Sequence, residues 1–217
     1  MLGLRRRRDA ASVMLSARPG RGGSRLEIVE RHGIQLASAA FLLGENQGLG
    51  AEAGIAQLIV RRLIADAAWG DVDCLVADLP PGMADVQQFV FGLRARPVYV
   101  LVVVTPQVIA HQDARRLLAD LGWHGVASLG GVENMSGQIC PSCGEATELF
   151  PPAPAEDSIW GLIPKLASTP FSAQAARDAD QGRPVMITGA VPGQAAAYRA
   201  LAGELWAEIT RPAAAQA

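Results

Sequence analysis

The sequence has little of what marks several large classes of protein. Three cysteines in 217 residues are too few for a disulfide framework, so we expect a reducing, cytoplasmic setting. The longest apolar run, Val98 to Val104, is far too short to cross a bilayer, so we expect no membrane partner. The formal net charge is −2, so no overall basic field points to a nucleic-acid partner.

Lysine is almost absent as well, and this bears on nucleotide binding. A P-loop needs Gly-x-x-x-x-Gly-Lys-Ser/Thr, in which backbone N–H groups hold phosphates and the lysine neutralises them. The one lysine, Lys165, follows Ile163-Pro164 and lies in no glycine-rich loop. The segment 18–24 is glycine-rich, but it follows no predicted strand and has no Gly-Lys pair. We therefore expect no P-loop in this sequence.

What is present is an alternation of apolar strands and amphipathic helices. Hydrophobic residues make up 50% of the chain, which is typical of globular proteins. We expect a disordered N-terminus at 1–24, one α/β domain at 25–210 and a tail at 211–217. Strands are expected at 25–31, 34–42, 75–77, 98–104, 126–132 and 158–163, and helices at 51–68, 85–93, 105–121, 171–180 and 193–209. This alternation predicts a mostly parallel, doubly wound sheet flanked by helices.

Asp78 ends the apolar run 75–77, and Pro80-Pro81-Gly82 stops it. The run does not alternate with polar residues, so it predicts a short strand buried on both faces. Cys74 would then be a small core residue. A carboxylate at the carboxyl end of such a strand points into the crevice where α/β proteins bind ligands, and there it can hold Mg²⁺ or its water. The alternative is that Asp78 caps the turn that follows.

Cys140 and Cys143 form a Cys-x-x-Cys motif in a segment, 133–155, that we expect to be a long irregular loop. Zinc and a [4Fe–4S] cluster each normally take four protein ligands, so two thiolates are half of such a site. The third cysteine lies in a predicted strand, and no histidine lies in the loop; we expect His111 to be an exposed helix residue. This count favours a metal or cluster bridging a homodimer. A redox pair, a structural zinc knuckle and an inert pair are the alternatives.

These motifs together resemble a known family. The segments that carry the resemblance are 69–73, 75–82, 104–107, 113–115, 132–136 and 140–144, with weaker matches at 161–164 and 182–185. In this order they resemble the Mrp/ApbC-type iron–sulfur cluster carriers, which are P-loop ATPases related to the MinD and ParA proteins. The resemblance implies a P-loop NTPase-like fold, here N-terminally incomplete because the Walker A segment is missing.

The resemblance also implies a role for each candidate site residue. Cys140 and Cys143 would bind a [4Fe–4S] cluster across a homodimer, for delivery to apo iron–sulfur acceptor proteins. Asp78 would hold Mg²⁺ through water, Gly82 would lie in the switch loop near the γ-phosphate of ATP, and Asn134 would meet the adenine base. The family's switch usually reads Gly-Thr-Gly-Asp, and here 82–85 reads Gly-Met-Ala-Asp. The alternative for Asn134 is a turn residue after a strand.

From these motifs we expect an iron–sulfur cluster carrier or scaffold with an incomplete ATP site. The alternatives are an ATPase completed by a missing N-terminal segment or a partner, and a zinc-stapled interaction module. Three explanations for the missing P-loop compete: a mis-set start codon, a partner that supplies it, and a carrier that has lost ATPase activity. Met1-Leu2-Gly3 resembles a Met-Leu-Gly that lies downstream of the family's P-loop, which favours an internal methionine at position 1.

Overall fold

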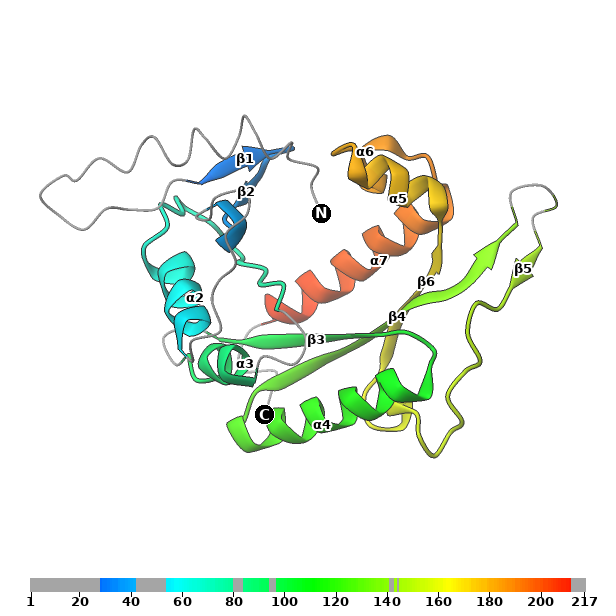
Figure 1. Ribbon diagram of the computed structural model, residues 1–217, viewed down its shortest axis with the longest axis horizontal. Coiled ribbons are helices and arrows are strands. Elements are labelled where there is room, and N and C mark those ends of the chain that lie inside the picture. The colour runs from blue at the N-terminus through cyan, green and yellow to red at the C-terminus, as the bar shows by residue number, and fades with distance from the viewer. Residues whose placement is uncertain are drawn as a thin grey trace, which may run out of the picture. The chain divides into compact units, whose positions relative to one another are not determined.

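The computed structural model describes residues 28–41, 54–79, 84–93, 97–140, 143 and 145–211. The chain divides into two compact units, Leu2–Gly92 and Leu93–Ala217 (Figure 1). Segment 1–24, predicted to be disordered, and Gly82 lie outside the described residues. Among the helices that are described, none is long and apolar enough to span a membrane.

The unit Leu2–Gly92 contains a short hairpin. β1 (Val29–Arg31) and β2 (Ile34–Leu36) pair antiparallel, which confirms the predicted turn between them. The turn residues His32 and Gly33 both have positive φ, 53° and 75°. A two-residue loop with two positive φ angles has a twist that matches the flanking strands, so it closes a tight hairpin.

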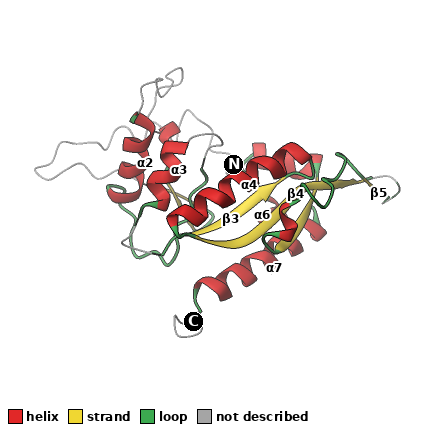
Figure 2. Ribbon diagram, turned by 90° about the horizontal axis from the view of Figure 1, so that it is seen from below, coloured by secondary structure: helices red, strands yellow, loops and turns green. Residues whose placement is uncertain are grey.

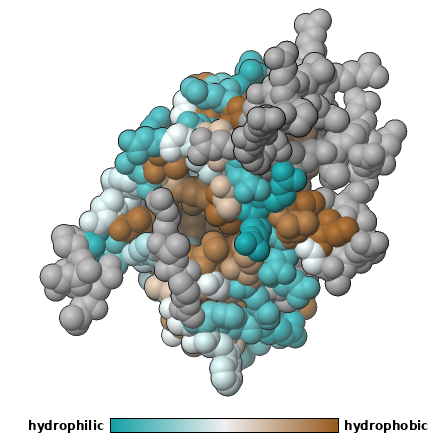
Figure 3. All heavy atoms as spheres, turned by 90° about the vertical axis from the view of Figure 1, so that its left-hand side faces the viewer, coloured by the Kyte–Doolittle hydropathy of each residue, from teal (hydrophilic) through white to brown (hydrophobic). Residues whose placement is uncertain are grey.

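Three helices follow the hairpin in this unit. They are η1 (Ala39–Phe41), α2 (Ile55–Ala65) and α3 (Ala84–Phe91). The last two confirm the helices predicted from apolar spacing. α2 leaves Leu58 57% exposed. On the face shown in Figure 3, apolar side chains reach the surface among hydrophilic ones.

The segment 72–79 is not the buried strand that its apolar run predicted. It belongs to no strand, and the side chains from Asp73 to Asp78 are exposed. Val76 is 87% exposed, and Cys74 is exposed too, so the prediction of a core cysteine is wrong. A strand needs a neighbour to take its backbone hydrogen bonds, and within the described residues no strand pairs with this segment.

The unit Leu93–Ala217 is built on a sheet centred on β4. Its strands are β3 (Tyr99–Val104), β4 (Ala127–Ile139), β5 (Ala146–Thr147) and β6 (Lys165–Phe171). β3 and β6 both run parallel to β4, and β5 pairs antiparallel with the end of β4. The mostly parallel sheet confirms the predicted fold class.

Helices cover both faces of this sheet. They are α4 (Val108–His124), η2 (Ile159–Gly161), α5 (Ala173–Asp180), α6 (Val185–Thr188) and α7 (Pro192–Ile209). α4 lies on one face and α7 on the other (Figure 2). Val102 and Val104 of β3 pack with Ala114 of α4 and Ile159 of η2 to form a buried core. α4 ends at Gly125, whose φ of 64° is the left-handed cap common after helices.

Two predictions for this unit are wrong. β4 continues to Ile139 and β5 pairs back on it, so the segment 133–155 is not one long irregular loop. The segment 158–163 is not a strand, because Ser158 Oγ accepts a hydrogen bond from Trp160 N–H at 3.2 Å and caps the short helix η2. The strand begins after it, at Lys165.

Candidate functional site

The two motif cysteines lie at the tip of a hairpin made by β4 and β5. The last residues of β4 pair with β5, and Cys140 N–H donates to the carbonyl of Glu145 at 2.9 Å, which closes the loop between the strands. Cys140 is half-buried and Cys143 is exposed. The hairpin extends away from the helices of its unit (Figure 1). At least one thiol of the motif is therefore accessible from solvent.

Within the described residues, the two cysteines do not belong to a larger group of metal-binding side chains. Among them, no three histidine, cysteine, aspartate or glutamate side chains are grouped so that they could hold a metal ion. Two soft thiolates suit iron or zinc, and both normally need four ligands. The pair therefore fits such a group as half of a site, with the other ligands supplied from elsewhere.

Asn134 lies on β4, six residues before Cys140, in the pairing with β6. Its Oδ1 accepts a hydrogen bond from Thr169 Oγ1 at 3.0 Å, and Thr169 is 1% exposed. The side chain is thus held by a buried hydroxyl of the neighbouring strand. The alternative interpretation, a turn residue after the strand, is wrong because β4 continues through Asn134.

The residues predicted to bind nucleotide and Mg²⁺ fall in two different units of the chain. Asp78 belongs to the unit Leu2–Gly92 and is exposed, whereas Asn134 belongs to the other unit. Gly82 lies outside the described residues. The roles of Asp78, Gly82 and Asn134 stay predictions.

Between Asn134 and the cysteine hairpin, β4 bulges out of its pairing with β6. The two strands pair at Asn134 and next at Gln138 of β4, so three residues of β4 face only Pro170 of β6. Met135, the first of the three, has a φ of 56°, in the left-handed region. Sequence reasoning missed this bulge, although Pro170 in an apolar segment was a signal for it, because proline has no N–H to give to a sheet.

Sequence reasoning also missed a buried histidine next to the sheet. His111 is 1% exposed, so its prediction as an exposed residue is wrong. Its Nδ1 accepts a hydrogen bond from Ile159 N–H at 3.2 Å, and its ring meets Trp160 edge to face at 5.4 Å. The signal was its position one turn before Ala114, on the apolar face of α4. Burial lowers the pKa of His111, against an opposing effect of the Glu133 carboxylate.

The single lysine of the chain, Lys165, lies beside the same Trp160 ring. Lys165 Nζ donates to both oxygens of the Glu133 carboxylate at 3.2 Å and lies 5.1 Å from the centre of the Trp160 ring. Trp160 Nε1 donates to the same carboxylate at 3.2 Å. Lys165 therefore ties the start of β6 to β4 and to η2, which is a structural use of the amine.

Two arginines from the segments that carry the family resemblance also hold the fold. Arg115 of α4 donates to the carbonyls of Glu156, Asp157 and Ser158, at 2.6 to 3.0 Å. Arg183 donates to Asp178 Oδ1 at 2.9 Å, and the Asp178 side chain is 5% exposed. Backbone carbonyls thus bind the guanidinium group of Arg115, and a buried carboxylate binds that of Arg183. These structural contacts explain an arginine at each position without invoking a bound ligand.

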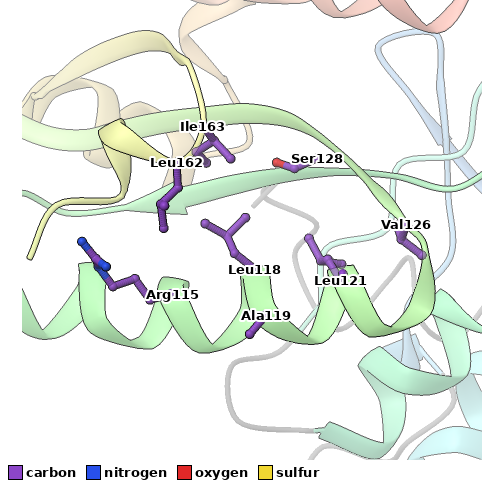
Figure 4. A pocket seen from close by; sticks show the side chains of 9 residues that line it. Arg115, Leu118, Ala119, Leu121, Val126, Ser128, Leu162 and Ile163 are labelled. Carbon is purple, nitrogen blue, oxygen red and sulfur yellow. The ribbon is translucent and has the colours of Figure 1, made fainter. Parts of the chain in front are cut away.

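An apolar hollow of about 470 Å³ lies along α4, but its chemistry does not suit a nucleotide (Figure 4). It is lined by Arg115, Leu118, Ala119, Leu121, Gly122, Val126, Ser128, Leu162 and Ile163. Its one charged group, Arg115, is already bonded to three carbonyls. Among the described residues that line the hollow, a phosphate would find no cation without a partner.

Comparison with known proteins finds relatives that are named for handling iron–sulfur clusters. The family model described as ParA, NUBPL iron-transfer P-loop NTPase, matches residues 11–206. The mouse protein named cytosolic Fe-S cluster assembly factor NUBP2 is 34% identical over 158 residues, which cover 71% of this chain and 58% of that protein. The protein of Pseudomonas fragi named iron-sulfur cluster carrier protein is 32% identical over 176 residues, 80% of this chain and 61% of that one.

A solved structure supports the same fold. The nucleotide-binding protein of Archaeoglobus fulgidus in complex with ADP superposes with a TM-score of 0.56 at 29% identity, over 75% of this chain and 63% of that one. The chain thus spans about three fifths of the length of these relatives. Because the family model covers most of the sequence, the chain belongs to the NUBPL iron-transfer P-loop NTPases of the ParA group.

Proposed function

We propose that the chain acts in iron–sulfur cluster assembly as a cluster carrier, with the cluster as its cargo. The observation that carries the proposal is the pair of cysteines at the tip of a projecting hairpin, with no third ligand grouped with them in the described part of the chain. The relatives named for cluster assembly and cluster transport support it. The relatives' name also supports the cytosol as the place of action.

In this proposal the cargo is a [4Fe–4S] cluster held by Cys140 and Cys143 of two copies of the chain. Each copy supplies two thiolates, which completes the four ligands that the cluster normally takes. A cluster held at the tips of two hairpins has an exposed edge, where thiolates of an apo acceptor protein can replace those of one copy. A carrier needs such exchangeable ligands, whereas a closed site would retain its metal.

The nucleotide part of the proposal concerns ATP and Mg²⁺. Asp78 would hold the ion through water, Gly82 would lie near the γ-phosphate, and Asn134 would contact the base. The ADP in the Archaeoglobus relative supports a nucleotide role for this fold. The sequence of this chain has no Gly-Lys pair to hold phosphates, so a segment that carries a P-loop would have to complete the site.

Anaerobic reconstitution with ferrous iron and sulfide tests the proposal. The chain should take up about two irons and about two sulfides per chain, because one four-iron cluster is shared by two copies. Cys140→Ala and Cys143→Ala should abolish uptake, while Cys74→Ala, which removes the cysteine of the other unit, should leave it unchanged.

Two outcomes would overturn this assignment. Stoichiometric zinc without sulfide, in protein prepared under mild conditions, would favour a zinc-stapled interaction module. A cluster-loaded monomer would show that one chain supplies all the ligands, which contradicts a cluster shared by two copies.

A further inference from the structure

The direction of the cysteine hairpin is set within three residues of β4. Up to Asn134 the strand is held firmly: it pairs with β3 and β6, and the Glu133 and Asn134 side chains are bonded to neighbouring elements. Beyond Gln138, the strand that pairs with β4 within the described chain is the two-residue β5. The bulge between them, Met135 to Gly137, therefore sets the direction in which β4 reaches Gln138, where pairing with Phe171 of β6 resumes and the hairpin with β5 begins.

The bulge is explained by a proline on the opposite strand, Pro170 of β6. Pro170 has no N–H, so β6 cannot donate a sheet hydrogen bond at this position. Its carbonyl oxygen accepts a hydrogen bond from Gln194 Nε2 of α7 at 3.2 Å, and Gln194 is 7% exposed. Pro170 is thus tied to the helix layer, and β4 must pass it without pairing.

Met135 absorbs the resulting change of direction in its own backbone. A φ of 56° is unfavourable for a residue other than glycine and persists only where the surroundings hold the backbone there. Here the paired residues on both sides hold it. Asparagine and glycine adopt this conformation readily, whereas a β-branched residue is strongly disfavoured in it.

The length of the hairpin magnifies any change at this bulge. Cys140 is the fifth residue after Met135, which corresponds to about 17 Å of extended strand. A rotation of about 10° at Met135 would therefore move the Cys140 thiol by about 3 Å. Metal–sulfur bonds tolerate a deviation of about 0.2 Å, so a shared cluster depends strongly on the angle at the bulge.

We propose that Met135 is a positioning residue for the metal site. Its left-handed backbone aims the hairpin so that the cysteine pairs of two copies meet at one point, and Pro170 opposite it enforces the bulge. This inference rests on the proposed function, because it concerns how two half-sites become one.

Substitutions that differ in their tolerance of positive φ test the inference. Met135→Asn and Met135→Gly should bind the cluster and dimerise as the wild type does. Met135→Val should lower iron and sulfide per chain at least fivefold and shift the protein to monomer. The Cys140 and Cys143 thiols of the Val variant should still react with a maleimide in wild-type number and at the wild-type rate, which a variant with a disordered hairpin would not show.

The controls separate the possible failures. Met135→Leu changes the side chain without β-branching and should behave as the wild type. If Met135→Val does not fold, as judged by circular dichroism, Pro170→Ala replaces it: an N–H restored opposite the bulge should lower cluster binding. Full cluster loading of folded Met135→Val, or of Pro170→Ala where that variant replaces it, would overturn the inference. A wild type that binds no cluster would instead overturn the proposed function.

Discussion

At the scale of the residue, Gly131 is under a severe steric constraint. A Cβ at this position would lie 2.7 Å from Cζ3 of Trp160. The Trp160 ring cannot give way easily, because it is bonded to Glu133 and packed against His111. Overpacking of this kind normally costs about 1 to 3 kcal/mol. The sequence shows a Gly-Gly pair here, but not that a ring 29 residues away requires it.

Gly131→Ala should therefore lower the free energy of unfolding by about 1 to 3 kcal/mol in urea titrations. Gly161→Ala is the matched control, because no atom lies within 4 Å of a Cβ at that position. It should change the free energy by less than about 0.5 kcal/mol. Equal stability of the two variants would show that Trp160 moves aside freely.

His111 gives the protein a stability that depends on pH. Its pKa is lowered in the folded state, chiefly by burial, so the unfolded chain binds a proton more readily. The stabilisation is complete above the ordinary pKa of 6.5 and is lost as the pH falls toward the lower folded pKa. Protonation would also remove the acceptor that Nδ1 offers to Ile159 N–H.

The wild type should thus lose more stability between pH 7.5 and pH 5 than His111→Asn, whose amide oxygen can accept the same hydrogen bond without titrating. Urea unfolding of both proteins at the two pH values measures the difference. Parallel losses in the two proteins would assign the pH dependence to other groups.

At the scale of the element, the sequence predicted the helices more accurately than the strands. The sequence predicted α2, α3, α4, α5 and α7, the first two from apolar spacing, because a helix satisfies its own backbone hydrogen bonds. The run 75–77 had the composition of a buried strand, yet it is exposed, because a strand also depends on a partner elsewhere in the chain. The reach of β4 to Ile139 was missed for the same reason: β5, not local composition, keeps it extended.

For the candidate site, the local motif could be predicted from the sequence, but the contacts between distant residues could not. The Cys-x-x-Cys motif is local, so its residues could be read from the sequence directly. The support of Asn134 by Thr169 could not, because 35 residues separate the two and only the register of β4 and β6 brings them together. The bulge at Met135 depends on Pro170 in the same way.

The hairpin itself depends on one glycine. A Cβ on Gly137 would lie 3.0 Å from the carbonyl oxygen of Thr147, which is tighter than ordinary contact. Gly137→Ala should separate β5 from β4, so the Cys140 amide, bonded to the Glu145 carbonyl, should exchange its hydrogen at least tenfold faster. Hydrogen exchange measures this, and the amides of β3 serve as the internal control. Unchanged exchange at Cys140 would mean that the hairpin accommodates a methyl group.

At the scale of the whole molecule, the chain combines a family fold with a sequence that has no P-loop motif. Its match to the family extends over residues 11–206, but it spans about three fifths of the length of its relatives. The cysteine motif is present in full, whereas the phosphate-binding motif is not in the sequence. Under the proposed function we therefore expect that cluster binding does not require ATP turnover by this chain.

The chain alone should not hydrolyse ATP at a useful rate. Charge on the transferred phosphoryl group is normally stabilised by P-loop amides and lysine together with Mg²⁺. The single lysine, Lys165, is held by Glu133 and Trp160, and Arg115 and Arg183 are held by carbonyls and by Asp178. These three cations thus already have structural partners, and Asp78 would contribute only to binding the metal ion.

Phosphate release by the purified chain, beside an Asp78→Ala control, measures this expectation. Robust turnover that the control loses would reveal a phosphate-binding loop elsewhere, and an ATPase would then replace the carrier as the primary function. Turnover that begins only when a separate segment with a P-loop is added would show that Asp78 and its unit are competent, and that the missing contribution is the phosphate cradle. Cluster loading measured in the same samples would then tell whether nucleotide turnover and cargo binding are coupled through β4, which carries both Asn134 and the cysteine hairpin.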